Sequence, residues 1–153
     1  MALEQRSAGR LTAAEVDALV DLHFPQVHTG GKVLFIEDAG HRHARVRMVA
    51  HERNVRPGNT ISGPSMFTLA DYSIYVAVLA TLGERALQAV TSNLNITYMQ
   101  RPEPRDIVCE VDLIKLGKRL VVAQSHLYSD GREEMIAHAI GTYALPSTKN
   151  AVK

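Results

Sequence analysis

The strongest constraint on the fold is a segment between Gly63 and Gly83 in which Asp71 is the only charged residue. Pro64 suits the first turn of a helix, with Ser62 or Gly63 as its cap, and Gly83 suits its end. The segment is long enough to span a membrane, but its internal polar residues and the lack of a second such segment favour a buried helix. A helix that is apolar all round must be covered on every side.

The rest of the chain predicts a sheet that covers this helix. Strand-like runs occupy residues 33–37, 44–49, 87–99, 107–116, 120–128 and 135–145. A turn at 38–40 separates the first two runs, and short connections make the last three antiparallel neighbours. Near the N-terminus, Thr12 and Glu15 form a capping-box pattern, which predicts a helix over about 12–24 that stops before Pro25.

This order of elements predicts an α+β hotdog fold, in which a curved antiparallel sheet wraps around a long central helix and an additional helix lies at the N-terminus. We expect a single domain over residues 1–153, with a core of about 33–146, because this length fits one domain. Part of the central helix or one face of the sheet would need a partner subunit to complete its burial.

Composition limits the partners. The chain has 17 basic and 16 acidic residues, so its net charge of +1 gives no reason to expect nucleic acid or an anionic membrane as a partner. The single cysteine, Cys109, cannot form an internal disulfide and is expected to be a small buried residue. The first residues contain no apolar run of signal-peptide type, and together these features predict a cytoplasmic protein.

Several short motifs then point to one family. Ser62-Gly63-Pro64 lies at a turn, Phe67-Thr68-Leu69-Ala70-Asp71 follows in the helix, and three further matching runs are 95–99 with Pro102, 116–120 and 137–143. With these motifs the chain resembles the hotdog-fold acyl-CoA thioesterases of the phenylacetate-degradation (PaaI-like) type, in the 4-hydroxybenzoyl-CoA thioesterase superfamily. The resemblance covers roughly residues 33–146. Members typically carry His-Gly-Gly at the turn, whereas this chain has Ser62 and Pro64 in place of the His and the second Gly.

The resemblance implies hydrolysis of acyl-CoA thioesters, with coenzyme A as part of the substrate and no metal or other cofactor. It makes Asp71 the general base or nucleophile and the Gly63 amide the oxyanion donor. It places the substrate beside four further residues, Ser62, Pro64, Asn59 and Thr91. It also implies a homo-oligomer, either a dimer or a tetramer.

The physical chemistry of the segment is compatible with these roles. Amides in the first turn of a helix lack intrahelical partners and favour negative charge, and glycine lets a substrate approach closely. A carboxylate among apolar neighbours is a stronger base. Asp71 lies seven positions beyond Pro64, or about 10 Å along the axis at a rise of about 1.5 Å per residue. A thioester carbonyl held at the Gly63 amide is therefore too far from Asp71 of the same chain, so either this amide is not the oxyanion donor or a second subunit brings its Asp71 to this helix start. The resemblance favours the second alternative, and we expect an active site shared between two subunits.

Other interpretations remain open at this point. Gly63 could serve only as part of a helix cap, and Asp71 could be a structural carboxylate that accepts hydrogen bonds. The chain could be a non-catalytic acyl-thioester-binding module, or a hotdog dehydratase or hydratase, although that chemistry usually pairs a His with the acidic residue. Ser65 lacks the final glycine of a nucleophile elbow. Four basic residues are candidates for contacts with the phosphates of coenzyme A, namely Arg101, Arg105, Lys118 and Arg119.

The histidines are weaker candidates. His41 and His43 stand two apart and could face one way as metal ligands, but no third ligand is spaced to join them, so a solvated surface is the better interpretation. His126 and His138 fall in late strands, where core or interface positions are the commoner outcome.

Overall fold

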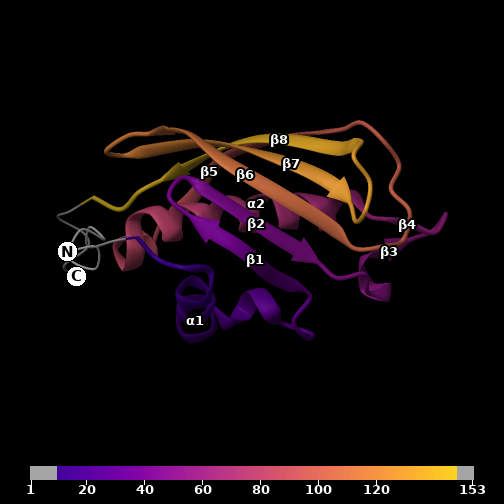
Figure 1. Cartoon of the computed structure of the whole chain (residues 1–153), viewed down its shortest axis with the longest axis horizontal. Coiled ribbons are helices and arrows are strands. Elements are labelled where there is room, and N and C mark those ends of the chain that lie inside the picture. The colour runs from indigo at the N-terminus through magenta and orange to yellow at the C-terminus, as the bar shows by residue number, and fades with distance from the viewer. Residues whose placement is uncertain (1–9, 148–153) are drawn as a thin grey trace.

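The computed structural model describes residues 10–147, in which a curved antiparallel sheet is wrapped around one long helix (Figure 1). The helix is α2, Gly63–Leu82, and the shorter helix α1, Ala13–His23, packs against it and against β1. The sheet contains β1 Leu34–Gly40, β2 His43–Met48, β5 Val90–Tyr98, β6 Ile107–Leu116, β7 Leu120–Ser129 and β8 Met135–Ala144, in the order β1-β2-β6-β7-β8-β5. The predicted hotdog architecture is confirmed.

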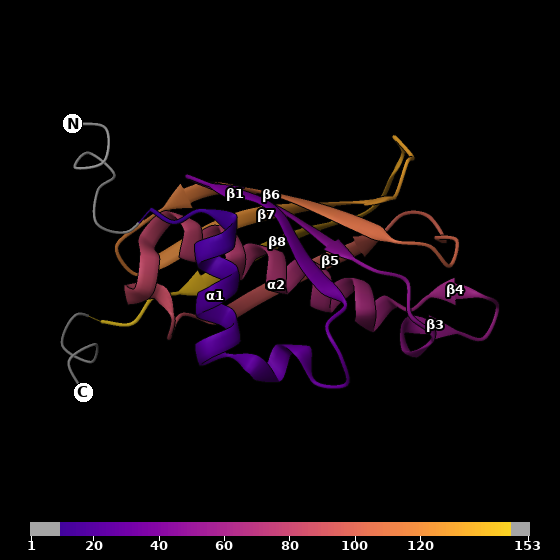
Figure 2. The same ribbon diagram turned by 60° about the horizontal axis from the view of Figure 1, so that its bottom comes forward.

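Short elements connect these parts. They are the 3-10 helices η1 Pro25–His28, η2 Glu52–Asn54 and η3 Gly83–Ala86, and a two-stranded hairpin of β3 Val55–Arg56 and β4 Thr60–Ile61. Figure 2 shows α1 crossing α2 on the side that β6, β7 and β8 leave open. The central helix is therefore covered by the sheet on one side and by α1 over part of the other.

Burial explains why α2 is apolar. All residues from Tyr72 to Leu82 are buried, and the two hydroxyls of Ser73 and Thr81 donate to carbonyls one turn earlier in the same helix. The segment Gly63–Ala86 is long and apolar enough to cross a membrane, but 83% of its most apolar window is buried inside the fold. Its hydropathy is therefore accounted for by its position in the core.

The capping box at the start of α1 is also present as predicted. The Thr12 hydroxyl accepts from the Glu15 amide, and the Glu15 carboxylate accepts from the Thr12 amide. Val16 and Val20 are fully buried on one face of the helix. The helix ends at His23, two residues before Pro25, because proline disfavours the helical conformation of the residue before it.

The predicted turn at 38–40 is wrong. These residues belong to β1, whose pairing with β2 shifts register between Ile36 and Asp38, and the turn falls one step later, at residues 41–42. Arg42 takes a left-handed conformation with φ of 63°. Its amide donates to Thr81 Oγ1 at 2.9 Å and its guanidinium donates to Leu113 O at 3.1 Å. Contacts distant in sequence therefore fix the position of this turn.

The strand after α2 starts later than predicted. Residues 83–86 form η3, and β5 begins only at Val90. Within the described residues β5 pairs with β8 on one side only, so it is an edge of the sheet. Most of its side chains are exposed, and Val90 and Tyr98 remain 61% and 45% exposed.

Candidate functional site

The start of α2 leaves one backbone donor without a partner. Ser62 is the N-cap: its amide donates to Asn54 O at 2.8 Å, and its hydroxyl accepts from the Ser65 amide at 3.2 Å. The Met66 amide donates to Ser62 O, and proline at position 64 has no N–H. Among the described residues, only the Gly63 N–H of this first turn has no acceptor. The predicted oxyanion donor is thus the one amide that this cap leaves available.

Gly63 also has a structural reason to be glycine. Tyr98 Oη donates to the Gly63 carbonyl at 2.7 Å, and a Cβ on Gly63 would lie 3.3 Å from Cζ and Oη of that tyrosine. Such a contact is tighter than ordinary van der Waals packing, so a side chain here would have to displace the ring. The close approach of Tyr98 therefore leaves little room for a side chain at this position unless the ring shifts.

A cavity of about 530 Å³ opens beside the Gly63 end of α2. Its lining includes Gly63 and Tyr98, together with two arginines, Arg56 and Arg101. Arg101 Nη2 donates to Gly58 O at 2.9 Å, which holds this side chain against the β3–β4 turn. Arg101 is thus the one of the four basic candidates for coenzyme A phosphates that lies beside Gly63.

The other residues predicted near the turn lie at its surface. Pro64 is exposed, and Asn59 occupies the β3–β4 turn in a left-handed conformation with φ of 57°. Neither lines the Gly63 cavity. Ser65 Oγ donates to Asn54 Oδ1 at 3.0 Å and lies 2.8 Å from Ser62 Oγ. Both serine hydroxyls are thus engaged in holding the loop to the helix start.

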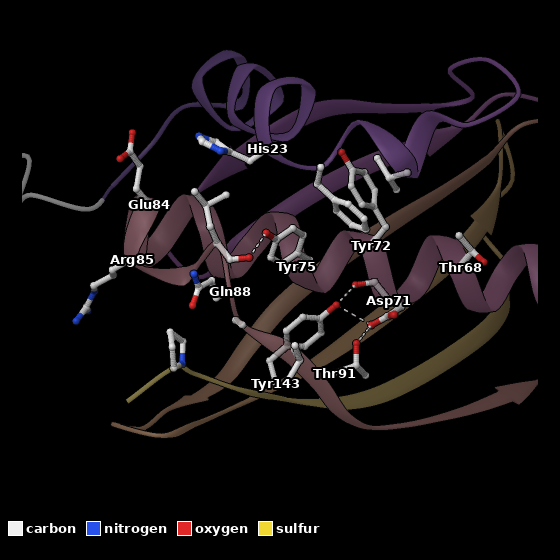
Figure 3. Close-up of a pocket in the computed structure, with 16 residues that line it drawn as sticks. His23, Thr68, Asp71, Tyr72, Tyr75, Glu84, Arg85, Gln88, Thr91 and Tyr143 are labelled. Carbon is white, nitrogen blue, oxygen red and sulfur yellow. Dashed lines mark hydrogen bonds between the residues drawn. The ribbon is translucent and has the colours of Figure 1, made fainter. Parts of the chain in front are cut away.

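Asp71 lies two turns further along α2, where its carboxylate meets two hydroxyl groups (Figure 3). Thr91 Oγ1 and Tyr143 Oη each donate to Asp71 Oδ1 at 2.7 Å, and Tyr143 Oη also lies 3.1 Å from the Asp71 carbonyl. Asp71 is half-buried and accepts hydrogen bonds, as the alternative of a structural carboxylate also expects. Hydrogen bonds from hydroxyls favour the charged form of a carboxylate.

Asp71 faces a cavity with a volume of about 810 Å³. Aromatic rings form much of its wall: Tyr75 packs edge-on against Phe24 and stacks on Tyr143, with centroids 6.1 Å apart in both pairs. The Tyr75 hydroxyl is tied to Leu87 O at 2.7 Å. His23, Glu84 and Arg85 also line this cavity, as Figure 3 shows.

The structure therefore separates the two predicted catalytic residues, and three of the predicted substrate-binding residues line neither cavity, namely Ser62, Pro64 and Asn59. Asp71 and Thr91 line one cavity, and Gly63 lines the other, so one chain does not bring Asp71 and Gly63 together. Sequence reasoning missed Tyr143, although it lies in the run 137–143 that carried part of the resemblance. It also missed Tyr98, whose contact with Gly63 depends on how β5 packs over the start of α2.

Three polar groups lie outside both cavities. His43 Nε2 is 3.1 Å from Asp38 Oδ2, and the rings of His126 and His138 lie 5.0 Å apart on neighbouring strands. The third group joins α1 and η1, where ligand atoms of Asp17, Asp21 and His28 lie within 4.8 Å of one another, a spacing that could hold a metal ion. There, however, the Lys32 ammonium donates to both oxygens of Asp17 at 3.0 Å and neutralises part of the charge.

Comparison with known proteins agrees with this fold. The sequence profile of the thioesterase superfamily matches residues 58–136, which is more than half of the chain and includes both Gly63 and Asp71. The chain belongs to the thioesterase superfamily. No curated protein matches its sequence significantly.

Solved structures place it among hotdog thioesterases. A candidate thioesterase from a Silicibacter species is 38% identical, with a TM-score of 0.80 over 92% of this chain and 97% of that one. Zebrafish thioesterase superfamily member 2 is 24% identical, with a TM-score of 0.72 over 88% and 95% of the two chains. The PaaI protein of the phenylacetic acid degradation operon of Escherichia coli is 16% identical, with a TM-score of 0.73 over 88% and 92%. The last two support the fold alone.

Proposed function

We propose that the protein hydrolyses acyl-CoA thioesters, with Asp71 as general base or nucleophile and the Gly63 amide as oxyanion donor. The observation that carries the proposal is the half-buried Asp71 carboxylate, held by two hydroxyls at the wall of a cavity of about 810 Å³ in a thioesterase superfamily member. A cavity of this size can enclose an acyl group. The proposed chemistry uses no metal or cofactor, and coenzyme A is part of the substrate.

The geometry of β5 supports a site shared between two subunits. Thr91, near the start of β5, contacts Asp71, and Tyr98, at its end, contacts Gly63. No strand in residues 10–147 pairs with the outer edge of β5, so this edge can pair with a second copy of itself. In an antiparallel pair related by a two-fold axis, the start of one β5 lies against the end of the other. Asp71 of one subunit is then brought to the Gly63 end of its partner.

The reaction follows from this arrangement. The Asp71 carboxylate takes a proton from a water molecule while the water oxygen bonds to the thioester carbonyl carbon. The negative charge that forms on the carbonyl oxygen accepts a hydrogen bond from the Gly63 N–H at the helix start of the other subunit. When the carbon–sulfur bond breaks, the thiolate of coenzyme A takes the proton back from Asp71, which leaves a free acid and a thiol.

Thiol release from a panel of short, medium, long and aryl acyl-CoAs tests the activity, in wild type and in Asp71→Asn. Loss of a general base lowers the rate by roughly 10²- to 10⁴-fold. We therefore expect release by the wild type and a fall of at least about 100-fold in Asp71→Asn. Absence of release on every thioester would exclude the enzyme, and equal rates would exclude Asp71 as the reacting group.

Mixing two inactive variants tests the shared site. Asp71→Asn and Gly63→Val are unfolded, mixed in equal amounts and refolded together. In a heterodimer one site keeps both Asp71 and Gly63, so we expect about a quarter of wild-type activity when half of the dimers are mixed, as the symmetry of a two-fold interface requires. Each variant refolded alone is the control. No recovery in the mixture, with mixed dimers demonstrated by mass, would place each site within one chain.

The position of His23 favours a second candidate function, that of a hotdog dehydratase or hydratase. His23 of α1 lines the same cavity as Asp71, so a histidine and an acidic residue share one site, as hotdog dehydratases and hydratases usually require. Incubation with an α,β-unsaturated acyl-CoA separates the two functions, because hydration removes the conjugated absorbance without releasing thiol. Loss of absorbance that depends on both His23 and Asp71 would favour the hydratase. Release of thiol without hydration favours the thioesterase.

A further inference from the structure

We propose that Tyr143 is a positioning residue for Asp71, and that it leaves Oδ2 as the carboxylate oxygen that reacts. This inference rests on the proposed hydrolysis at Asp71 but concerns a residue to which the proposed reaction assigns no role. It follows from the unequal environments of the two carboxylate oxygens and from the way the sheet places both donors on one of them.

The hydrogen bonds divide the two oxygens of Asp71. Oδ1 accepts from Thr91 Oγ1 and from Tyr143 Oη, each at 2.7 Å, whereas no group in the described residues donates to Oδ2. An oxygen that already accepts two short hydrogen bonds is a poorer base and nucleophile than one that accepts none. Oδ2 is therefore the oxygen left to take a proton from water or to attack a carbonyl carbon.

The sheet register brings the two donors together. Thr91 of β5 and Tyr143 of β8 are directly paired residues on neighbouring antiparallel strands. Their pairing is followed at once by a register shift between Thr91 and Asn93, and an irregularity of this kind re-aims the side chains beside it. Both hydroxyls consequently point at the same atom of a helix that packs across the strands. The carboxylate is oriented by the sheet rather than by its own helix.

Tyr143 is itself rigidly held. Its side chain is buried, stacks on Tyr75 with an angle of 14° between the rings, and spans from Asp71 Oδ1 to the Asp71 carbonyl. Burial, and then the nearby Asp71 carboxylate, raises the pKa of Tyr143 far above its ordinary value. The phenol therefore keeps its proton at every pH at which an esterase assay is run, and it remains a donor throughout.

Replacement of Tyr143 by phenylalanine removes this donor and keeps the ring. The charged form of Asp71 loses one of its two hydrogen bonds, so the acidic limb of the pH dependence of kcat/KM should move to higher pH. We expect the limb to shift by about one pH unit, because a shift of this size corresponds to the free energy lost with one hydrogen bond to a charged group. Activity should be reduced most at low pH and should approach that of the wild type on the alkaline side of the limb.

Tyr75→Phe is the matched control. It removes a buried phenol hydroxyl from the same ring stack, but that hydroxyl donates to Leu87 O and not to Asp71. The other titratable groups that line the cavity, His23 of α1, Tyr72 of α2, and Glu84 and Arg85 of η3, are unchanged in both variants. Tyr75→Phe should leave the acidic limb in place, whatever it does to KM or to thermal stability.

A further pair of variants separates orientation from general damage to the fold. Thr91→Val removes the second donor to Oδ1. In this background Tyr143→Phe should shift the acidic limb further than it does in the wild type, because Oδ1 of the double variant has no donor. A limb that stays in place in Tyr143→Phe, or that moves equally in Tyr75→Phe, would overturn the assignment. A wild type without thioesterase activity would instead contradict the proposed function, so the two failures are distinct.

Discussion

Tyr98 Oη donates to the carbonyl oxygen of Gly63 at 2.7 Å and so ties the last residue of β5 to the first residue of α2. This contact links the edge strand of the sheet to the residue whose amide is the only N–H in the first turn of α2 without an acceptor among the described residues. Gly63 therefore has a role in the packing of the fold, in addition to its proposed contact with the substrate. Substitutions at Gly63 must therefore be interpreted with a structural control.

Gly63→Ala should destabilise the fold measurably. The added Cβ would lie 3.3 Å from the end of the Tyr98 ring, which is 45% exposed, so the ring must shift and the cost should lie near the lower end of the range of about 1–3 kcal/mol for overpacking. Gly40→Ala is the matched control, because a Cβ there meets nothing within 4 Å. Urea unfolding followed by circular dichroism checks both variants. Equal stability of Gly63→Ala and the wild type would mean that the ring moves aside at no cost.

Pairing of β5 with a second copy makes a defined cross-link possible. If the Thr91 end of one strand meets the Tyr98 end of the other, residue 92 lies opposite residue 97 of the partner. The double variant Ser92→Cys with Thr97→Cys should form covalent dimers on mild oxidation, since paired residues on neighbouring strands are about 4.5–5.5 Å apart. Within one chain these positions are about 17 Å apart along an extended strand, too far for a disulfide.

The two single-cysteine variants are the controls for this experiment and should remain uncross-linked. Non-reducing gel electrophoresis together with light scattering reads the result. A chain that is monomeric by light scattering and forms no cross-link would exclude β5 pairing, and with it the proposed shared site. A dimer without the cross-link would point to a different register or a different interface.

The difference between predicted and observed features has a physical pattern. The cap at Ser62, the length of α2 and the capping box at Thr12 depend on residues close together in sequence, and they were predictable. The β1–β2 turn was misplaced because Arg42 is held by groups about 40 and 70 residues away. Contacts of that kind leave no local signal.

The candidate site follows the same pattern. Asp71 was identifiable because it interrupts an apolar helix. Its hydrogen bonds were not, because they depend on the pairing of Thr91 with Tyr143 and on the irregularity beside that pair. The separation of Asp71 from Gly63 could be predicted from helix rise alone. Whether a second subunit closes that gap depends on surfaces that the sequence does not mark.

The packing of α1 gives a prediction about stability. Val20 lies on the packed face of α1 and is fully buried, whereas Leu22 of the same helix is 72% exposed. Val20→Ala should destabilise the protein by about 1–3 kcal/mol through lost burial and the hole left behind, and Leu22→Ala should change stability by less than about 0.5 kcal/mol. Thermal unfolding compares the two. Similar losses in both variants would mean that α1 does not pack as the structure shows.

Cys109 provides a prediction about pH. Burial raises the pKa of its thiol to about 12, from an ordinary value of 9.0. Hydrogen bonds with the side chains of Ser73 and Ser125 act in the opposite direction and lower this pKa. The folded protein should therefore contain almost no thiolate at pH 8–9, and the buried sulfur should react with a thiol reagent only at the rate of unfolding. Because the unfolded thiol ionises first, the contribution to stability is complete below about pH 9 and is lost as the pH rises towards 12.

Reaction with an aromatic disulfide reagent at pH 8 measures this directly. We expect one slow thiol in native protein, rapid reaction in urea, and a native rate that follows the unfolding rate when denaturant is varied. Cys109→Ala, the reagent blank, should show no reaction under either condition. Rapid stoichiometric reaction without denaturant would show that the thiol between β6 and α2 is open to solvent, and would contradict the tight packing of the sheet over the central helix.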